Sequence, residues 1–350
     1  MDMSIRFPKL GIEFEYVAGA FRINEFDLSI YGLLIAVGML AGLMVVMLEV
    51  KRAREDQNQY LWMLIFAVIG ALIGARLLYA AFSWKQFQGD FMEVFRIRNG
   101  GMAIYGAIGG GTLAIALYAR LRKLDFMKMA DFASIGFLVG QIIGRWGDFF
   151  NRESFGEYTD GIFAMQIPLA SVRSSEVTSL MRENLVMIDG VSYIQVHPTF
   201  FYESMWCLFL LFVLLRYKRR KKFQGEIFMR YLAGYGFGRF WIEYLRTDSL
   251  MIPGMKISVS FVISAGLFIV FGTVATVERF MMKKREALRR RRKEAYYEAA
   301  NSILENQNSA KETEYGNPDE GGSFEKTAGK SEAGLSDVEL SDESETEKEK

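Results

Sequence analysis

Hydrophobic residues in this chain are gathered into long segments that carry few or no charges. Residues 28–48 are uncharged throughout, and about 20 consecutive apolar residues are enough for a helix to cross a bilayer. Six further segments of this kind follow, although one is short and several contain charged residues. The pattern predicts seven membrane-spanning helices at residues 28–48, 60–84, 100–119, 132–145, 198–215, 227–245 and 257–277.

Basic residues between these segments predict how the chain is oriented. Lys and Arg are concentrated after the first, third, fifth and seventh segments, at residues 51–54, 120–128, 216–222 and 283–293. All four clusters lie on one side of the membrane only if all seven segments cross it. Because such clusters face the cytoplasm, the N-terminus is expected outside and the C-terminus inside.

One connecting segment on the outer side is long enough to fold. Apolar and polar residues alternate at 162–167, which predicts a strand, and Asp189-Gly190 is a turn signal. The fold class is therefore an all-α polytopic membrane protein with a small extracytoplasmic cap. The expected parts are an extracytoplasmic N-terminal segment at 1–27, a core at 28–278 with the cap at about 147–197, a charged helix at 279–305 and an acidic, disordered tail at 306–350.

Composition adds little to this organisation. Hydrophobic residues make up 51% and charged residues 24% of the chain, and the net charge of +1 identifies no partner because the charges are segregated. The single cysteine, Cys207, excludes an intramolecular disulfide and is expected to be a small buried hydrophobe. Glycines at 106–111 and 234–238 lie within predicted spans, so they favour close helix packing over a nucleotide-binding loop. No nucleic-acid partner is expected.

Ionisable residues within the spans are the candidates for function. Placing one such residue at the centre of a membrane-spanning helix costs roughly 2.5–3.5 kcal/mol of insertion free energy, so its presence points to a function. They are Arg76, Arg145, Glu203, Arg239 and Glu243, with Asp131 and His197 at the borders. Arg239 and Glu243 are four residues apart and are expected to pair, which could be only a device for inserting the helix. Three arginines against two glutamates leave a positive surplus, which favours a phosphate group as ligand.

Four segments in order resemble the prolipoprotein diacylglyceryl transferase family. They are GGMAIYG at 100–106, GRWGDFFNRESFG at 144–156, HPTFFYE at 197–203 and YGFGRFWIEYLR at 235–246. Tyr31-Gly32 and Gly74-Ala75-Arg76 also fit, and the likeness extends from about residue 22 to about 280. The resemblance implies an enzyme of the bacterial cell (inner) membrane. It would transfer the diacylglyceryl group of phosphatidylglycerol to the lipobox cysteine of a prolipoprotein, form a thioether and release glycerol phosphate.

The resemblance also implies roles for individual residues. Arg145 and Arg239 would hold the phosphate, and Glu243 would orient Arg239. Asn151, Glu153 and Gly156 would shape the head-group site. The other residues assigned to substrate binding are Tyr31, Arg76, His197, Glu203 and Arg246. The sole histidine precedes a proline at a helix start, so a capping or other structural role is also expected for it. No cofactor and no metal are implied, and the oligomeric state is not specified.

Two positions depart from the family pattern. Tyr105 stands where many members have His, and a phenol with a pKa of about 10 is a poor base at neutral pH. Tyr105 is therefore expected to bind or orient substrate. Asp148 stands where Asn is usual, and it could either pair with Arg145 or serve as the base for the thiol. Two other functions stay open: a lipid or small-anion transporter, and a catalytically degenerate relative that only binds lipid.

Overall fold

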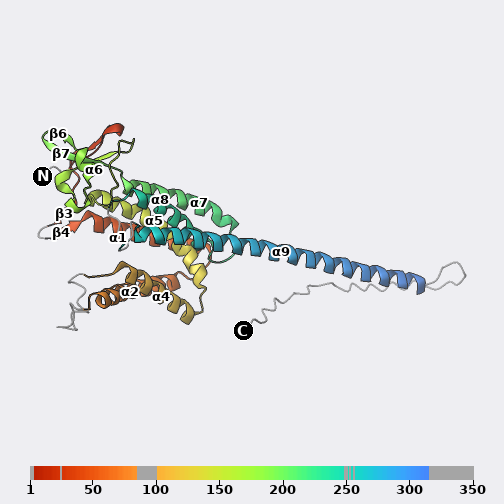
Figure 1. The fold of residues 1–350 in the computed structure, drawn as a ribbon. Helices are drawn as coiled ribbons and strands as arrows, with labels where there is room; N and C mark the ends of the chain where they lie inside the picture. The colour runs from red at the N-terminus through yellow and green to blue at the C-terminus, as the bar shows by residue number, and fades with distance from the viewer. Residues whose placement is uncertain are drawn as a thin grey trace. The chain divides into compact units, whose positions relative to one another are not determined.

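The computed structural model of the chain describes residues 4–23, 26–84, 101–247, 251, 254 and 257–314 (Figure 1). It forms two compact units, whose boundary lies between Glu286 and Ala287. Seven long helices are described, and each predicted span falls on one of them. They are α1 (Ile30–Arg52), α2 (Gln57–Phe82), α4 (Ile104–Arg122), α5 (Phe126–Asn151), α7 (Thr199–Tyr217), α8 (Glu226–Leu245) and α9 (Val259–Glu314).

Six of these helices are long and apolar enough to cross a membrane, counting only the described residues. The exception is α8, whose charged residues lower its hydropathy. The predicted fourth span was too short, because α5 begins after Asp125 and ends before Arg152. The Asp125 carboxylate accepts hydrogen bonds from the first backbone N–H groups of the helix, and Arg152 adopts a left-handed φ of 54°. Both signals lie outside the apolar run, so hydropathy alone missed them.

Close contacts between glycines join the first helices in pairs. The helix α1 packs along α5, and α2 packs along α4 (Figure 1). A Cβ added to Gly74 would lie 2.3 Å from the carbonyl oxygen of Gly106, and one added to Gly42 would lie 2.6 Å from that of Gly136. Glycine therefore permits the close approach of both pairs. The predicted packing role is confirmed for Gly106, whereas a Cβ built at Gly109 would have no described atom within 4 Å beyond the local backbone of its own helix.

The helices α5, α7 and α8 pack together around a separate apolar core. Cys207 on α7 is fully buried there, with Leu138 from α5 and Ile227 from α8. The interpretation of this cysteine as a small buried hydrophobe is therefore confirmed.

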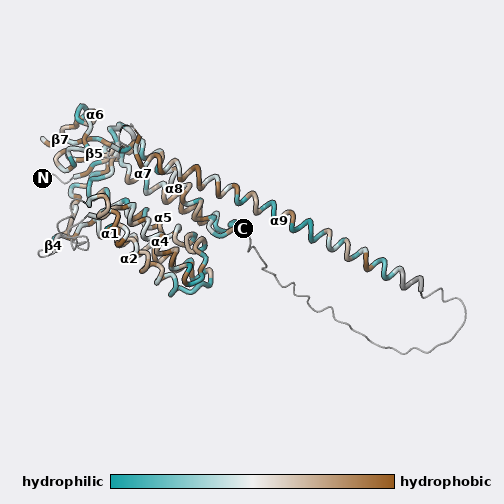
Figure 2. The backbone as a smooth tube through the Cα atoms, turned by 60° about the horizontal axis from the view of Figure 1, so that its bottom comes forward, coloured by the Kyte–Doolittle hydropathy of each residue, from teal (hydrophilic) through white to brown (hydrophobic). Residues whose placement is uncertain are grey.

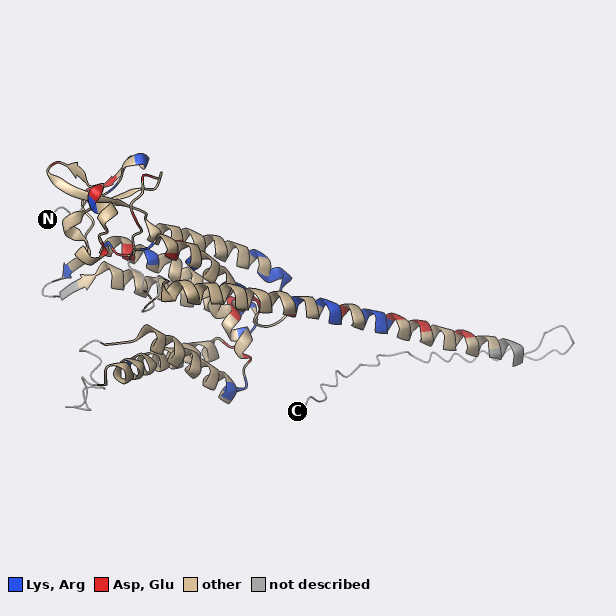
Figure 3. Ribbon diagram, viewed as in Figure 1, with Lys and Arg blue, Asp and Glu red and all other residues tan. Residues whose placement is uncertain are grey.

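The helix α9 is continuous where the sequence predicted a span and a second, charged helix. It extends to Glu314, past residue 306, where the acidic tail was expected to begin; residues 315–350 of that tail lie outside the described residues. Its composition changes along its length from apolar to strongly charged (Figures 2 and 3). Backbone hydrogen bonding in a helix does not depend on side-chain polarity, so the change in composition does not end the helix.

The cap region forms a five-stranded antiparallel sheet within the described residues. Its strand order is β2 (Ile12–Phe14), β1 (Ile5–Phe7), β5 (Met165–Pro168), β7 (Val191–Val196) and β6 (Val186–Ile188). The predicted strand is observed slightly later, as β5 (Met165–Pro168), and Asp189-Gly190 forms the turn between β6 (Val186–Ile188) and β7 (Val191–Val196). Both turn residues have positive φ, as a two-residue hairpin requires. The all-α class is thus incomplete, because the protein is mostly helical but contains strands.

The N-terminal segment belongs to the same sheet, which the sequence did not predict. The strands β1 (Ile5–Phe7) and β2 (Ile12–Phe14) extend it beyond β5, and Ile5 is fully buried against the cap core. A separate hairpin of β3 (Ala20–Ile23) and β4 (Phe26–Ser29) leads directly into α1. The pairing of β1 with β5 aligns Arg6 with Gln166, which are far apart in sequence, so local patterns do not reveal it.

Candidate active site

Two arginines meet at one buried glutamate where α5, α7 and α8 come together. The Glu203 side chain is only 3% exposed, and its Oε1 lies 2.7 Å from Nη2 of Arg145. Its other oxygen, Oε2, accepts a hydrogen bond of 2.9 Å from Nη1 of Arg239. The Tyr235 hydroxyl also donates to Oε1, at 3.3 Å. Glu203 therefore fixes two guanidinium groups beside each other.

Each arginine also has a second carboxylate partner. Arg145 Nη1 donates to Asp148 Oδ2 at 3.0 Å, and Arg239 Nη2 lies 2.7 Å from Glu243 Oε2. The predicted Arg239–Glu243 pair is thus confirmed, and of the two readings of Asp148 the structure shows the pairing with Arg145. Glu243 is held in turn by the Ser258 hydroxyl, which donates to Oε1 at 3.0 Å and accepts from the Phe261 N–H. The sequence signal for Ser258 was its position just before an apolar run, which is typical of a helix cap.

The expected surplus of positive charge is wrong for this cluster. Arg145 and Arg239 are matched by three carboxylates, those of Asp148, Glu203 and Glu243. Arg246 lies within electrostatic range of Glu203 and Asp148, and with it the formal charges cancel. The count from sequence failed because it included Arg76 and left out Asp148.

A neutral cluster can still bind an anion through unused donors. A guanidinium group has five N–H donors, and Arg145 and Arg239 each direct Nη1 to one carboxylate and Nη2 to another. Further N–H groups of both therefore stay available to a ligand. The arginine side chains are 26% and 14% exposed, whereas that of Glu203 is 3% exposed, so the cluster is reached from the arginine side.

Backbone contacts of Gly156 close the site beside the cluster. The Gly156 N–H donates to the His197 carbonyl at 2.9 Å, and Gly156 forms an isolated antiparallel bridge with Arg246. A Cβ at Gly156 would lie 2.6 Å from the Leu245 carbonyl oxygen and 2.9 Å from the His197 Cβ. Only glycine fits here, and the contact places the segment after α5 against the end of α8. Arg246 Nη2 also donates to the Ser154 hydroxyl, at 3.3 Å.

Comparison with known proteins identifies the family. The family model described as prolipoprotein diacylglyceryl transferase matches residues 18–277, which include every residue of this cluster. The chain belongs to this family. Curated relatives named phosphatidylglycerol–prolipoprotein diacylglyceryl transferase include three from different genera.

The relative from Clostridioides difficile strain 630 is 36% identical over 239 residues, which are 68% of this chain and 87% of that protein. The relative from Bacillus cytotoxicus is 35% identical over 251 residues, covering 72% and 88% of the two chains. The relative from Listeria innocua is 34% identical over 255 residues, covering 71% and 88%. The family match, at residues 18–277, ends before the charged part of α9.

Three residues that the family resemblance assigned to lipid binding lie around α5. Asn151 is the last residue of this helix, and the Tyr31 ring packs directly on Gly147 in the preceding turn. Glu153, in contrast, pairs with Arg173 of the cap at 2.5 Å. The Glu153 side chain therefore contacts the cap and not the arginine cluster, although its backbone N–H donates to the Asp148 carbonyl at 3.0 Å.

Sequence reasoning missed the role of Arg152 next to this segment. Its side chain is buried, and Nη2 donates to the Val17 carbonyl at 2.7 Å. The contact joins the end of α5 to the N-terminal segment, some 135 residues apart in sequence.

Two predicted site residues belong to the α2–α4 pair. Arg76 is buried on α2, donates to the Gly101 carbonyl at 2.9 Å and lies over the Tyr79 ring. Tyr105 lies on α4 with half of its surface exposed. Their described contacts are within this pair of helices, so the structure does not bring them into the Arg145–Arg239 cluster.

Of the two structural roles expected for His197, capping of the helix is wrong, and a structural contact with α7 is observed. Pro198 occupies the N-cap of α7, and within the described residues no side chain bonds the first N–H groups there. The imidazole Nδ1 instead lies 3.2 Å from the hydroxyl of Tyr202, one turn into α7. Burial lowers the pKa of His197 below its usual value, so the ring is neutral at pH 7.

Proposed function

We propose that this chain transfers the diacylglyceryl group of phosphatidylglycerol to the lipobox cysteine thiol of a prolipoprotein. The observation that carries the proposal is the pair of guanidinium groups, Arg145 and Arg239, fixed on the buried carboxylate of Glu203. Membership of the prolipoprotein diacylglyceryl transferase family supports it, as do the names of the curated relatives, which state both substrates.

The reaction is a displacement at a glyceryl carbon. The cysteine sulfur forms a C–S bond, the C–O bond to phosphate breaks, and glycerol phosphate leaves with the electron pair of that bond. The thiol proton must be lost, because the thiolate is the nucleophile. Negative charge grows on the leaving phosphate as the bond breaks. Donors of Arg145 and Arg239 that are already fixed in position stabilise this charge without reorganisation in the transition state.

Neighbouring residues set the geometry of the two arginines. Glu243 is fixed by Ser258 and therefore orients Arg239, while Asp148 pairs with Arg145 and tunes the local charge. Gly156 and Asn151 shape the head-group site at the end of α5. Tyr31, His197, Glu203 and Arg246 make up the rest of the proposed substrate site near the cluster. Arg76, Tyr105 and Glu153 are proposed to contact substrate away from it, because their described side-chain contacts lie elsewhere.

The proposed topology has seven spans, with α8 as the one that hydropathy does not identify. Its charges are matched: Glu226 bonds Arg279 at 2.6 Å and Arg230 at 3.2 Å, and Arg239 has two carboxylate partners. Pairing lowers the cost of placing these residues in a bilayer. The basic loops put the N-terminus and the cap outside and the C-terminus in the cytoplasm of a bacterial cell (inner) membrane.

The test uses the full chain purified in detergent, with phosphatidylglycerol and a lipobox peptide, and follows release of glycerol phosphate and formation of the thioether. The variants are Arg239→Ala, Arg239→Lys and, as a matched control, Arg122→Ala at the exposed end of α4. We expect the control to keep full activity. Arg239→Ala should lower the rate of glycerol phosphate release at least about 100-fold. Arg239→Lys should recover little of this rate, because a lysine cannot form a bidentate contact with phosphate.

Other results would point to the alternative functions. Intact phosphatidylglycerol that moves between the leaflets of vesicles containing the purified protein, with no release of glycerol phosphate, would identify a transporter. An inactive, well-folded wild type that Asp148→Asn activates would identify a degenerate relative.

A further inference from the structure

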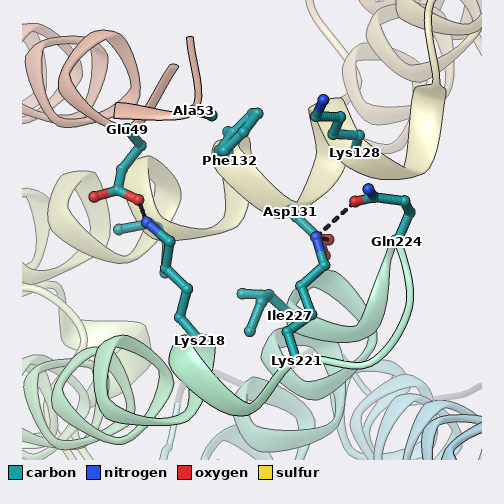
Figure 4. Close-up of a pocket in the computed structure, with 10 residues that line it drawn as sticks. Glu49, Ala53, Lys128, Asp131, Phe132, Lys218, Lys221, Gln224 and Ile227 are labelled. Atoms are coloured by element: carbon teal, nitrogen blue, oxygen red, sulfur yellow. Dashed lines mark hydrogen bonds and ion pairs between the residues drawn. The ribbon is translucent and has the colours of Figure 1, made fainter. Parts of the chain in front are cut away.

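A polar cavity lies toward the other end of α5, one of the helices that carry the arginine cluster. It has a volume of about 230 Å³ and is formed where α1 and α7 end and where α5 and α8 begin (Figure 4). Asp131 in its wall precedes Arg145 on α5 by 14 residues, which is roughly 21 Å along a helix at 1.5 Å per residue. The cavity is therefore separate from the proposed active site.

Acidic groups of this cavity are buried and basic groups line its rim. The side chains of Glu49 and Asp131 are 3% and 4% exposed. Those of Lys218, Lys128 and Lys221 are 35%, 31% and 24% exposed. A ligand that enters from solvent or from the membrane surface thus meets ammonium groups first.

The carboxylates are already occupied by protein groups. Both oxygens of Asp131 accept backbone N–H bonds of 2.8 Å, from Gly225 and Phe228 at the start of α8, and Lys221 Nζ lies 2.7 Å away. Glu49 pairs with Arg52 at 2.9 Å and with Lys218. A cation would have to displace these partners, so the cavity is suited to an anion.

The lysines, in contrast, have N–H donors that their described protein partners do not use. An ammonium group has three N–H donors. Lys218 directs one to Glu49 and Lys128 directs one to Glu55, while Lys221 uses two, on Asp131 and Gln224 (Figure 4). Three lysines against two carboxylates in the lining also leave one positive charge. The basic segment at 216–222 adds to the potential that attracts anions here.

We propose that this cavity binds a phosphate-bearing anion, held by Lys128, Lys218 and Lys221. Basic pockets between membrane helices on the cytoplasmic side commonly take the head groups of anionic lipids, and in the proposed topology this cavity faces that side. The volume admits a head group, and the acyl chains stay in the bilayer. An occupant would join the ends of α1, α5, α7 and α8, and binding to the folded state alone raises thermal stability.

Thermal unfolding of the full chain in neutral detergent tests the proposal. The chain is titrated with dioctanoyl phosphatidic acid, with inorganic phosphate, and with dioctanoyl phosphatidylcholine, whose head group has no net charge. The variant is Lys128→Gln. The ion-pair partner of Lys128 is Glu55, which is 30% exposed, so removing the lysine leaves no buried carboxylate without a partner. The matched control is Lys51→Gln, an exposed lysine of α1 outside the cavity. Lys128→Arg keeps the charge.

We expect phosphatidic acid to raise the unfolding temperature of wild type, Lys51→Gln and Lys128→Arg. Lys128→Gln should bind it about tenfold more weakly, as expected for loss of one charge-assisted hydrogen bond, with no change in KM for phosphatidylglycerol. A response to inorganic phosphate at equal or lower concentration, with the same dependence on Lys128, would identify free phosphate as the source of the anion. Equal binding by Lys128→Gln and Lys51→Gln, or an equal response to phosphatidylcholine, would overturn the proposal. Glycerol phosphate release is measured separately, so a failed lipid response and a failed transferase are distinguishable.

Discussion

Replacing Asp148 with asparagine tests how the arginine cluster binds phosphate. The Asp148 carboxylate is 8% exposed and lies 3.0 Å from Arg145, on the guanidinium that the lipid phosphate would also contact. Asparagine has nearly the same shape and can still accept the hydrogen bond from Arg145. The substitution therefore removes one negative charge from a formally neutral cluster and changes little else.

The size of the effect follows from the distances. A phosphate on the far side of the Arg145 guanidinium would lie roughly 6 Å from Asp148, because each hydrogen bond spans about 3 Å. Two unit charges at that distance repel by about 3 kcal/mol when the effective dielectric constant is about 20. Arg145 is held less firmly by a neutral amide, which offsets part of the gain. We expect a net gain of about 1.5 kcal/mol, or a roughly tenfold lower KM for phosphatidylglycerol.

Steady-state release of glycerol phosphate in detergent measures this KM. The matched control is Asp160→Asn, which makes the same chemical change on an exposed cap residue that pairs with Lys9 at 2.9 Å, and its KM should equal that of wild type. An unchanged KM for Asp148→Asn would refute the electrostatic reasoning. A fall of more than tenfold in kcat, with loss of the acid limb of the pH profile, would instead make Asp148 the proton acceptor for the thiol.

Three further substitutions probe other parts of the site. Gly156→Ala should destabilise the protein by about 1–3 kcal/mol and reduce activity, because the added Cβ would lie only 2.6 Å from the Leu245 carbonyl oxygen. The control for unfolding is Gly266→Ala, whose added Cβ has no described atom within 4 Å beyond the local backbone of its own helix. Tyr105→Phe should keep kcat within about threefold, since loss of a general base costs about 100-fold or more. Burial lowers the pKa of His197, so the unfolded state binds the proton first and stability falls as the pH drops below about 6.5. In His197→Gln, the free energy of unfolding should therefore fall less steeply with decreasing pH.

Sequence patterns predicted the helices because the uncharged runs are local signals. The ends of α5 were harder to predict from sequence, because Lys128 and Asp131 have the polar character of loop residues. Both lie within the helix, and the Asp131 carboxylate accepts a hydrogen bond from the Gly225 N–H at the start of α8. The Arg239–Glu243 pair was predictable because four residues bring side chains to one helix face.

Long-range contacts were beyond the reach of the sequence. No local sequence pattern indicates that Glu203 pairs with both Arg145 and Arg239, or that β1 joins the cap sheet. The charge count failed for the same reason. Whether Arg76 and Arg246 belong to the cluster depends on how the helices pack, although the Arg145–Asp148 pair, three residues apart on one helix, was open to prediction from sequence.

A site of this kind has to satisfy two conflicting conditions. Unpaired arginines would be costly in a low-dielectric environment, so Glu203 and Glu243 are needed to hold Arg145 and Arg239 in the folded protein. The same carboxylates repel the anionic substrate. The structure reconciles these conditions by geometry: the deeply buried Glu203 takes one donor-bearing nitrogen from each arginine, and both guanidinium groups keep further N–H groups on their more exposed side. Positive potential toward the substrate therefore comes from the arrangement of donors and not from excess charge, which is why counting charged residues could not reveal it.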